Sequence, residues 1–426
     1  MKLTPPFELF SEIECEIVKM SSHGEGIGIS EQYPGWYFYI PFCYPGEKVK
    51  CKVFASHRGY SKADNLEILV HSEDKITPRC QYFGKCSGCQ WQDISYDRQL
   101  ELKDELLKRA FYYGSRDIYD TLPFFPPVSS PLQYEYRSKI TPHFNKPRPD
   151  DEVSVGFMQK GRRSVMDIEE CILGTPAVNE GYKNLRVKVK ENITSYKKGA
   201  SLIIRESLQP SKEDPSQEEW GTVTDHKGLI TTKVGEYRFT FPAGSFFQIN
   251  TSILPSLIDY VSAQLAKIQP KPKYLLDAYC GSGFFAVGCS SGFEKVVGVD
   301  VNQQSIDYAT GNAEMNSLQN CSFQVGQAEI IFDGLSFTGK DAAVIIDPPR
   351  KGCSTDFLEQ LVKFSPEGIV YISCNPFSQA KDLTELLKLC KGTGFTYKVD
   401  QVRVFDLFPM TMHGEGLVTL IKVKEE

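Results

Sequence analysis

The feature that most constrains the fold is an alternation of apolar runs and amphipathic segments between residues 239 and 426. The apolar runs have the length of buried strands. The segments between them, such as Gln303 to Asn316 and Asp356 to Phe364, have the pattern of helices. The strand candidates are Tyr274 to Tyr279, Lys295 to Asp300, Ala342 to Asp347 and Ile369 to Ser373. This alternation predicts a doubly wound α/β domain with a parallel sheet.

The first predicted strand runs into a glycine turn and then a helix start, which is the pattern of a nucleotide-type ligand site. Gly281 and Gly283 allow a ligand to approach the backbone, where helix amides face it. The next strand ends at Asp300, whose carboxylate is placed to hold ribose hydroxyls. The spacing of the two glycines and Ala286 also fits a dinucleotide site. Asp277, inside the first strand, and the later motifs favour S-adenosylmethionine (SAM).

A cysteine, Cys374, follows the last predicted strand and precedes a helix-like stretch that begins at Ser378. Open α/β sheets bind their ligands at the carboxyl ends of the strands. A helix N-terminus beside the thiol would favour the thiolate, which is the nucleophilic form. A free cysteine is also often an ordinary small core residue. Cys374 taken alone leaves both interpretations open.

The third predicted strand ends in Asp347, followed by two prolines and Arg350. Two prolines after an acid make a rigid edge beside a ligand. Amino-group methylases have a related acid-Pro-Pro sequence, in which the next residue is aromatic and stacks on a flipped base. Arg350 stands in that place here, and an arginine suits a phosphate or a polar base edge better.

Two zones precede the α/β domain. Residues 8–68 contain short β-rich runs separated by glycine and proline turns, which predicts a small barrel. Residues 70–238 contain one helix-like stretch, Tyr96 to Tyr113, and several β-like segments. The whole chain has a net charge of −6, yet Arg137 to Arg205 contains 14 Lys and Arg against 8 Asp and Glu. This local excess suits RNA phosphates, and an ordinary solvated face is the alternative.

The 13 cysteines are many for a chain without a visible secretory signal or a long apolar run. We expect a cytoplasmic protein with no membrane partner, in which clustered cysteines bind metal rather than form disulfides. Cys80, Cys86 and Cys89 form such a cluster, and Cys171 follows later. Four thiolates could hold zinc or an iron–sulfur cluster, and the spacing does not decide between them.

Several motifs of the chain resemble the RNA uracil-5-methyltransferase family, in that family's order and spacing. The resemblance is closest to the branch with a TRAM domain and an iron–sulfur cluster that modifies 23S ribosomal RNA. It implies a TRAM-like RNA-binding barrel at 8–68, an iron–sulfur and RNA-binding domain at 70–238, and a Rossmann-like SAM-dependent methyltransferase domain at 239–426. The motifs are Ser245 to Asn250, Asp277 to Ala286, Asp347 to Gly352, Ser373 to Pro376, and Asp406 to Glu415.

The resemblance implies Cys374 as nucleophile and Glu415 as base. Carbon 5 of uracil is a poor nucleophile, and a thiolate that adds to carbon 6 turns the ring into an enolate that can take a methyl group at carbon 5. A base must then remove the proton at carbon 5 so that the thiolate can leave. This is covalent catalysis with a separate proton acceptor.

The resemblance also implies the ligands of two cofactors. A [4Fe–4S] cluster would be held by Cys80, Cys86, Cys89 and Cys171, with zinc as the alternative. The implied SAM contacts are Gln248, Tyr279, Phe284, Asp300, Gln327 and Asp347. Three of these depart from the family's usual residues. Asp300 stands where Glu is common, Phe284 replaces a polar residue, and Gln327 replaces Asn.

RNA is the expected partner, and no protein partner is evident from the sequence. Candidate contacts are Tyr37, Tyr39, His57-Arg58, Tyr136 to Lys139, and Lys160 to Arg163. A stacked uracil cannot be attacked, so the base must be flipped or lie in a refolded loop. Three alternatives stay open: the same chemistry on tRNA, a non-catalytic scaffold that binds SAM and RNA, and a dinucleotide oxidoreductase with an iron–sulfur centre, which a binding test with NADPH would distinguish.

Overall fold

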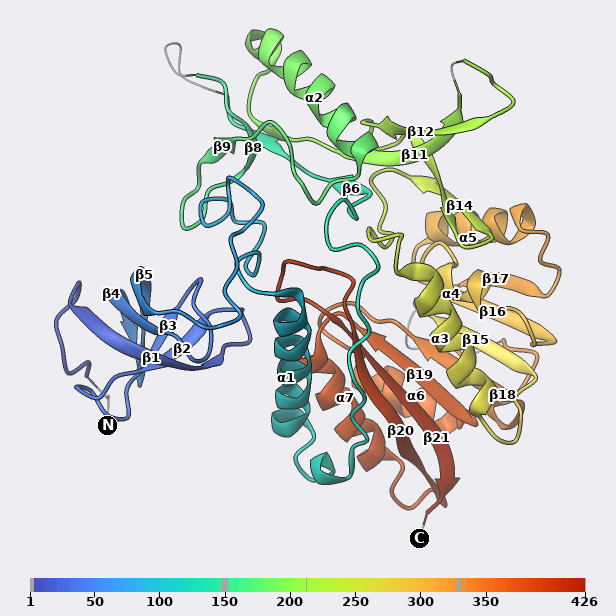
Figure 1. The fold of residues 1–426 in the computed structure, drawn as a ribbon. Coiled ribbons are helices and arrows are strands. Elements are labelled where there is room, and N and C mark those ends of the chain that lie inside the picture. Colours follow the sequence, from blue (N-terminus) through green and yellow to red (C-terminus); the bar gives the residue numbers. More distant parts are fainter. Residues whose placement is uncertain (1–3, 147–151, 212, 327–330, 333, 426) are drawn as a thin grey trace. The chain divides into compact units, whose positions relative to one another are not determined.

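The computed structural model describes residues 4–146, 152–211, 213–326, 331–332 and 334–425, drawn in colour in Figure 1. The chain divides into two compact units. The first contains residues 1–106, 157–166 and 408–412, and the second contains the remaining residues. Within the described part of the chain, no helix is long and apolar enough to cross a membrane.

The first unit contains the small barrel that the sequence predicts, and the barrel is closed in the order β1-β2-β3-β5-β4. Burial alternates along the strands, so that Ile13, Cys15 and Ile17 point into the core beside Phe38 and Val53. This alternation is the period-2 pattern of a sheet with one buried face. The strands are β1 (Glu12–Met20), β2 (Gly26–Ile29), β3 (Tyr37–Ile40), β4 (Lys48–His57) and β5 (Tyr60–Val70).

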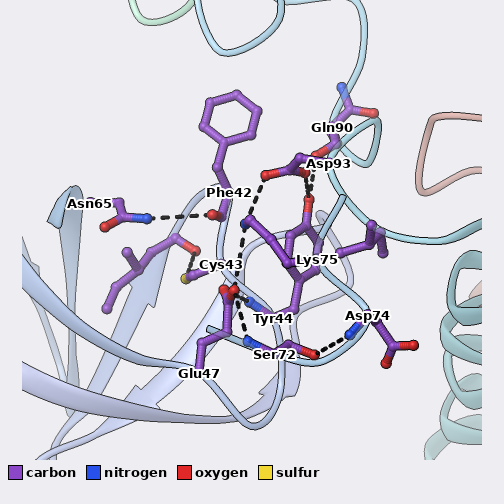
Figure 2. Close-up of polar contacts among 12 residues, drawn as sticks. Phe42, Cys43, Tyr44, Glu47, Asn65, Ser72, Asp74, Lys75, Gln90 and Asp93 are labelled. Carbon is purple, nitrogen blue, oxygen red and sulfur yellow. Dashed lines mark hydrogen bonds and ion pairs between the residues drawn. The ribbon is translucent and has the colours of Figure 1, made fainter. Parts of the chain in front are cut away.

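A buried ionic network connects the barrel with the segment that leads to the cysteine cluster (Figure 2). The Nζ of Lys75 lies 2.8 Å from Oδ2 of Asp93 and 3.5 Å from Oε1 of Glu47, whose side chain is fully buried. The hydroxyl of Tyr44 donates to Asp93 and to the carbonyl of Gln90. Buried charges are tolerated only when they are paired. This network therefore holds the segment after the barrel in one position within the unit.

We expect Lys75→Ala to destabilise the protein by about 3–5 kcal/mol, because it leaves two buried carboxylates without their cation. Denaturant unfolding, followed by far-ultraviolet circular dichroism, measures this change. Lys48→Ala is the matched control. Lys48 pairs with Glu14 at 2.8 Å, but both side chains are about half exposed, and such pairs contribute less than about 1 kcal/mol. Equal losses in the two variants would contradict the structural importance of the Lys75 network.

The second unit is built around a seven-stranded sheet in the order β17-β16-β15-β18-β19-β21-β20. The first five strands are parallel, whereas β21 runs antiparallel to β19 and to β20. The four predicted strands are β15, β16, β18 and β19. The strands are β15 (Tyr274–Ala278), β16 (Lys295–Asp300), β17 (Cys321–Val325), β18 (Ala342–Ile346), β19 (Gly368–Ser373), β20 (Phe395–Phe405) and β21 (Glu415–Lys424).

Helices pack against this sheet as the alternating sequence pattern requires. Leu361 of α6 and Leu386 of α7 lie in one buried core with Val344 of β18 and Ile369 of β19. The long helices of the chain are α1 (Tyr96–Gly114), α2 (Pro176–Glu191), α3 (Leu254–Lys267), α5 (Gln303–Met315), α6 (Thr355–Phe364) and α7 (Pro376–Leu389), and α4 (Phe284–Gly288) is short. Helix α2 packs against β11 and β12 rather than against this sheet.

The rest of the chain forms small antiparallel sheets and short 3₁₀ turns. Strand β11 pairs with β12 over a long hairpin and also with β6, and β13 pairs with β14. The strands are β6 (Lys139–Ile140), β7 (His143–Phe144), β8 (Val155–Met158), β9 (Val165–Asp167), β10 (Ala200–Ser201), β11 (Ile204–Pro210), β12 (Glu218–Val223), β13 (Leu229–Val234) and β14 (Tyr237–Pro242). The domain boundaries at 8–68, 70–238 and 239–426 stay a prediction.

Candidate active site

Sheet register brings Cys374 and Glu415 together at one end of the second unit's sheet. Strand β19 ends at Ser373, which pairs with Gly416 of the antiparallel strand β21. Cys374 directly follows Ser373 at the end of β19, and Glu415 directly precedes Gly416 at the start of β21. Glu415 is only 3% exposed, whereas Cys374 is half-buried. A thiol and a buried carboxyl group thus lie side by side where the parallel strands end.

The turn that carries Cys374 is fixed by the start of α7. Asn375 is the N-cap residue, and its side-chain oxygen accepts a hydrogen bond from the amide of Phe377 at 3.2 Å. Pro376 occupies the first helical position, where a missing amide hydrogen costs nothing. The hydroxyl of Ser373 accepts from the amide of Asn375 at 3.1 Å. The thiol is therefore held on a rigid turn between a strand and a helix.

Burial is the main cause of the raised pKa values of Cys374 and Glu415. Burial, followed by the charges of Glu415 and Asp347, raises the pKa of the Cys374 thiol to about 11, although Arg350 opposes the shift. Burial and the charge of Asp347 raise the pKa of Glu415 to about 8, again against Arg350. Burial alone raises the pKa of Asp347 to about 7. In the free protein, burial therefore opposes the thiolate that the helix N-terminus was expected to favour.

The glycine turn is open on the side where a ligand would lie. Gly281 has φ of +53° and Gly283 has φ of +84°, which are left-handed conformations that favour glycine. A Cβ added to Gly281 would meet no atom within 4 Å. The carboxylate of Asp300 accepts from the amides of Gly281 at 3.0 Å and Asn302 at 2.9 Å. Each carboxylate oxygen has a further lone pair, so Asp300 can also accept from a ribose hydroxyl.

The other predicted SAM contacts lie around the same end of the sheet. Tyr279 follows β15 with φ of +65°, and its ring lies 5.3 Å from that of Phe357. Phe284 packs into an aromatic cluster, 5.7 Å from the ring of Phe247, so it contributes an apolar surface. Gln248 is buried, and Asp347 follows β18. Gln327 lies outside the described residues. The open glycine turn fits SAM, and the individual contacts stay predictions.

Arg205 is a buried residue of this region that the sequence reasoning missed. Its guanidinium donates hydrogen bonds to the carbonyl oxygens of Ala243 at 3.1 Å, Ser245 at 2.6 Å and Phe247 at 3.2 Å. Burial lowers the pKa of Arg205 to about 10. The arginine thereby fixes the segment that leads to Gln248 and leaves the ring of Phe246 78% exposed. The sequence feature that could have indicated a buried arginine is the position of Arg205 directly after the apolar run 202–204.

The four predicted cluster ligands are distributed over both units, with Cys80, Cys86 and Cys89 in the first and Cys171 in the second. All four are half-buried. Across the ranges that the structure describes, no three His, Cys, Asp or Glu side chains are grouped as a metal site. The [4Fe–4S] assignment, with zinc as its alternative, stays a prediction.

The sheet order, the open glycine turn and the acid at the end of β16 define a SAM-dependent methyltransferase fold, and the comparisons with known proteins agree. The family described as "tRNA (Uracil-5-)-methyltransferase" matches residues 226–423. The chain is 45% identical, over 98% of its length and 80% of the relative's, to the tRNA (uracil(54)-C(5))-methyltransferase of Schizosaccharomyces pombe. It is 38% identical to the protein of that name in Saccharomyces cerevisiae, over 96% and 73% of the two chains.

The chain therefore belongs to the tRNA (uracil-5-)-methyltransferase family and is a SAM-dependent RNA uracil-5-methyltransferase. A solved structure supports the fold. The Pyrococcus abyssi tRNA (uracil-54, C5)-methyltransferase in complex with S-adenosyl-L-homocysteine has a TM-score of 0.69 and 23% identity, and the match covers 96% of this chain and all of that one. The non-catalytic scaffold and the NADPH-dependent oxidoreductase gain no support from these relatives.

Proposed function

We propose that this chain methylates carbon 5 of a uracil in tRNA through a covalent bond between the Cys374 sulfur and carbon 6 of the base. The observation that carries this proposal is the register that sets Cys374 beside Glu415. The backbone of Arg350 lies next to them, because its carbonyl oxygen accepts a hydrogen bond from the side chain of Asn375. The sequence analysis favoured 23S ribosomal RNA over tRNA. The names of the two fungal relatives and of the family favour the tRNA alternative.

Each group has a task that follows from its surroundings. The Cys374 thiol gives its proton to solvent water and its sulfur adds to carbon 6, and the positive charge of Arg350 stabilises the thiolate. SAM supplies the methyl group that carbon 5 then takes. Glu415, as a carboxylate, removes the proton from carbon 5, and the bond between sulfur and carbon 6 breaks to restore the ring. Burial raises the pKa of Glu415 and so makes its carboxylate a stronger base than an exposed one.

Positive charge and an exposed aromatic ring near Gln248 suit an unstacked RNA segment. Burial, followed by the charges of Arg205 and Arg137, lowers the pKa of Lys139 to about 8. Bound RNA phosphates would offset the repulsion between these neighbouring positive charges. The ring of Phe246 is 78% exposed, which is unusual for phenylalanine and offers a face for an unpaired base.

We expect Phe246→Ala to weaken RNA binding by about 1–3 kcal/mol, the usual contribution of one base stacked on an aromatic ring. SAM affinity should not change. Filter binding with tRNA and calorimetry with SAM separate the two effects. Val187→Ala is the control, since Val187 is also an exposed apolar residue, at 53%, but lies on α2. If Phe246→Ala binds RNA as tightly as the control does, this ring makes no stacking contact.

The barrel offers a second aromatic surface, and its assignment as a TRAM domain stays a proposal. The ring of His57 stacks on Tyr60 at 4.8 Å, and Tyr39 lies 4.9 Å from Tyr60. Tyr37 on β3 is 44% exposed. Rings that lie together on one exposed surface can stack on single-stranded bases.

The substrate class is tested with RNA that carries tritium at carbon 5 of uracil. Total tRNA and 23S ribosomal RNA are offered separately with SAM, and tritium release into water is counted. We expect release from tRNA only. Release only from 23S ribosomal RNA would overturn the substrate assignment while leaving the chemistry intact. Methylation of either RNA without tritium release would place the methyl group on another atom.

A further inference from the structure

One face of α7 holds the loop between Asp347 and Cys353. The carbonyl oxygen of Arg350 accepts from Nδ2 of Asn375 at 2.9 Å and from the hydroxyl of Ser378 at 3.1 Å. One turn further along the helix, Oδ2 of Asp382 accepts from the amide of Cys353 at 2.7 Å. Residues at positions i, i+3 and i+7 lie on one side of a helix. The helix that follows the nucleophile thus fixes both the middle and the end of this loop.

The end of the loop is shaped to fit Asp382. Gly352 has φ of +83°, and a Cβ added there would lie 2.5 Å from Oδ2 of Asp382. The hydroxyl of Tyr371, in the middle of β19, donates to the same oxygen at 2.5 Å. Asp382 is only 9% exposed, and burial raises its pKa, although its hydrogen bonds from Tyr371 and Cys353 oppose that shift. One buried carboxylate oxygen therefore connects a strand, a helix and the loop.

We infer that Asp382 is a positioning residue that, together with Asn375 and Ser378, holds the loop so that Arg350 lies beside Cys374. Arg350 lies on the surface of the loop, and a long exposed side chain does not hold one conformation by itself. Its position depends on the backbone that carries it, and α7 anchors that backbone on either side of Lys351. This inference depends on the proposed function only in that it takes Cys374 to be the nucleophile.

The position of Arg350 should affect the pKa of the Cys374 thiol. The charged groups around this thiol are Glu415 on β21, Asp347 after β18, and Arg350 in the loop. The two carboxylates disfavour the thiolate, and Arg350 is the group that favours it. Without Asp382 the loop is held only through Asn375 and Ser378, so Arg350 is less restrained and the thiol should lose its proton only at a higher pH.

The test follows alkylation of Cys374 by iodoacetamide as a function of pH, with peptide mass spectrometry as the readout, in the full chain without RNA. Only the thiolate reacts, so the midpoint reports the thiol pKa. Asp382→Ala should raise this midpoint by about one pH unit, the size of shift that a nearby opposite charge produces. Asp382→Asn keeps an oxygen that can accept from Cys353 and Tyr371, and it should restore the wild-type midpoint.

Thr384→Val is the control on the same helix, because the Thr384 hydroxyl donates to the carbonyl of Gly114 at 2.8 Å, away from the loop. Thr384→Val should leave the midpoint unchanged. Tyr371→Phe removes one of the hydrogen bonds to Asp382, so it should raise the midpoint by less than Asp382→Ala does. An unchanged midpoint in Asp382→Ala, or equal shifts in Asp382→Ala and Asp382→Asn, would overturn the inference. Because no RNA is used, this result is independent of whether the tritium assay supports the proposed function.

Discussion

Replacing Cys374 with alanine should abolish methyl transfer, with a loss of roughly 10⁴-fold or more, as expected when the nucleophile of a covalent mechanism is removed. SAM affinity should be unchanged, because the thiol acts on the uracil ring. Methyl transfer from radiolabelled SAM to tRNA measures the loss, and calorimetry measures the affinity. Carbon 5 of uracil does not become nucleophilic without the addition of a thiolate at carbon 6, so no pH should restore the activity of the variant.

Cys321→Ala is the matched control, since Cys321 is also a half-buried cysteine in the same sheet, on β17. It should retain activity within a few-fold of the wild type. If Cys374→Ala also retained activity within tenfold, the covalent mechanism would be wrong. A parallel loss of SAM binding in Cys374→Ala would instead indicate that the thiol supports the cofactor site.

Replacing Glu415 with glutamine should permit methyl transfer and then trap the RNA on the protein, with turnover reduced about 10²- to 10⁴-fold. The charge of Glu415 raises the pKa of Cys374, so its removal eases the attack on carbon 6. The proton at carbon 5 then has no acceptor, and the sulfur cannot leave. A protein–RNA complex that survives denaturing electrophoresis should accumulate with SAM and tRNA.

Glu425→Gln is the control, because Glu425 follows the other end of β21 and its carboxylate accepts from the amides of Gly392 and Gly394. It should turn over normally and leave no stable complex. If Glu415→Gln released methylated RNA at the wild-type rate, another group would have to be the base. If it formed neither product nor complex, Glu415 would act before methyl transfer.

The parallel part of the sheet could be predicted because each of its central strands is a short apolar run buried on both faces. The predicted bounds of α5 and α6 agree with the structure to within a residue. Strand β17 was missed because it lies at the sheet edge and is only partly buried, so it has no apolar run. Strands β20 and β21 were missed as well, since their antiparallel pairing depends on contacts that no local pattern specifies.

The location of Cys374 at a strand end followed from local pattern, whereas Glu415 came only from the family resemblance. The two residues meet through the register of β19 with β21, which the sequence does not reveal. The raised pKa of Cys374 was also beyond sequence reasoning, because it depends on how deeply the thiol is buried and on two carboxylates from other strands. The role of Arg205 depends in the same way on three carbonyl groups about forty residues away.

The most direct measurement is to identify the residue that bonds to tRNA in which 5-fluorouracil replaces uracil. Fluorine at carbon 5 cannot leave as a proton, so the covalent intermediate should persist after methyl transfer. Incubation with SAM, digestion with protease and nuclease, and mass spectrometry locate the modified peptide. The account predicts that Cys374 carries a methylated fluorouridine nucleotide. A nucleotide on any other residue, or methylation of unsubstituted tRNA with no adduct on the fluorinated tRNA, would contradict it.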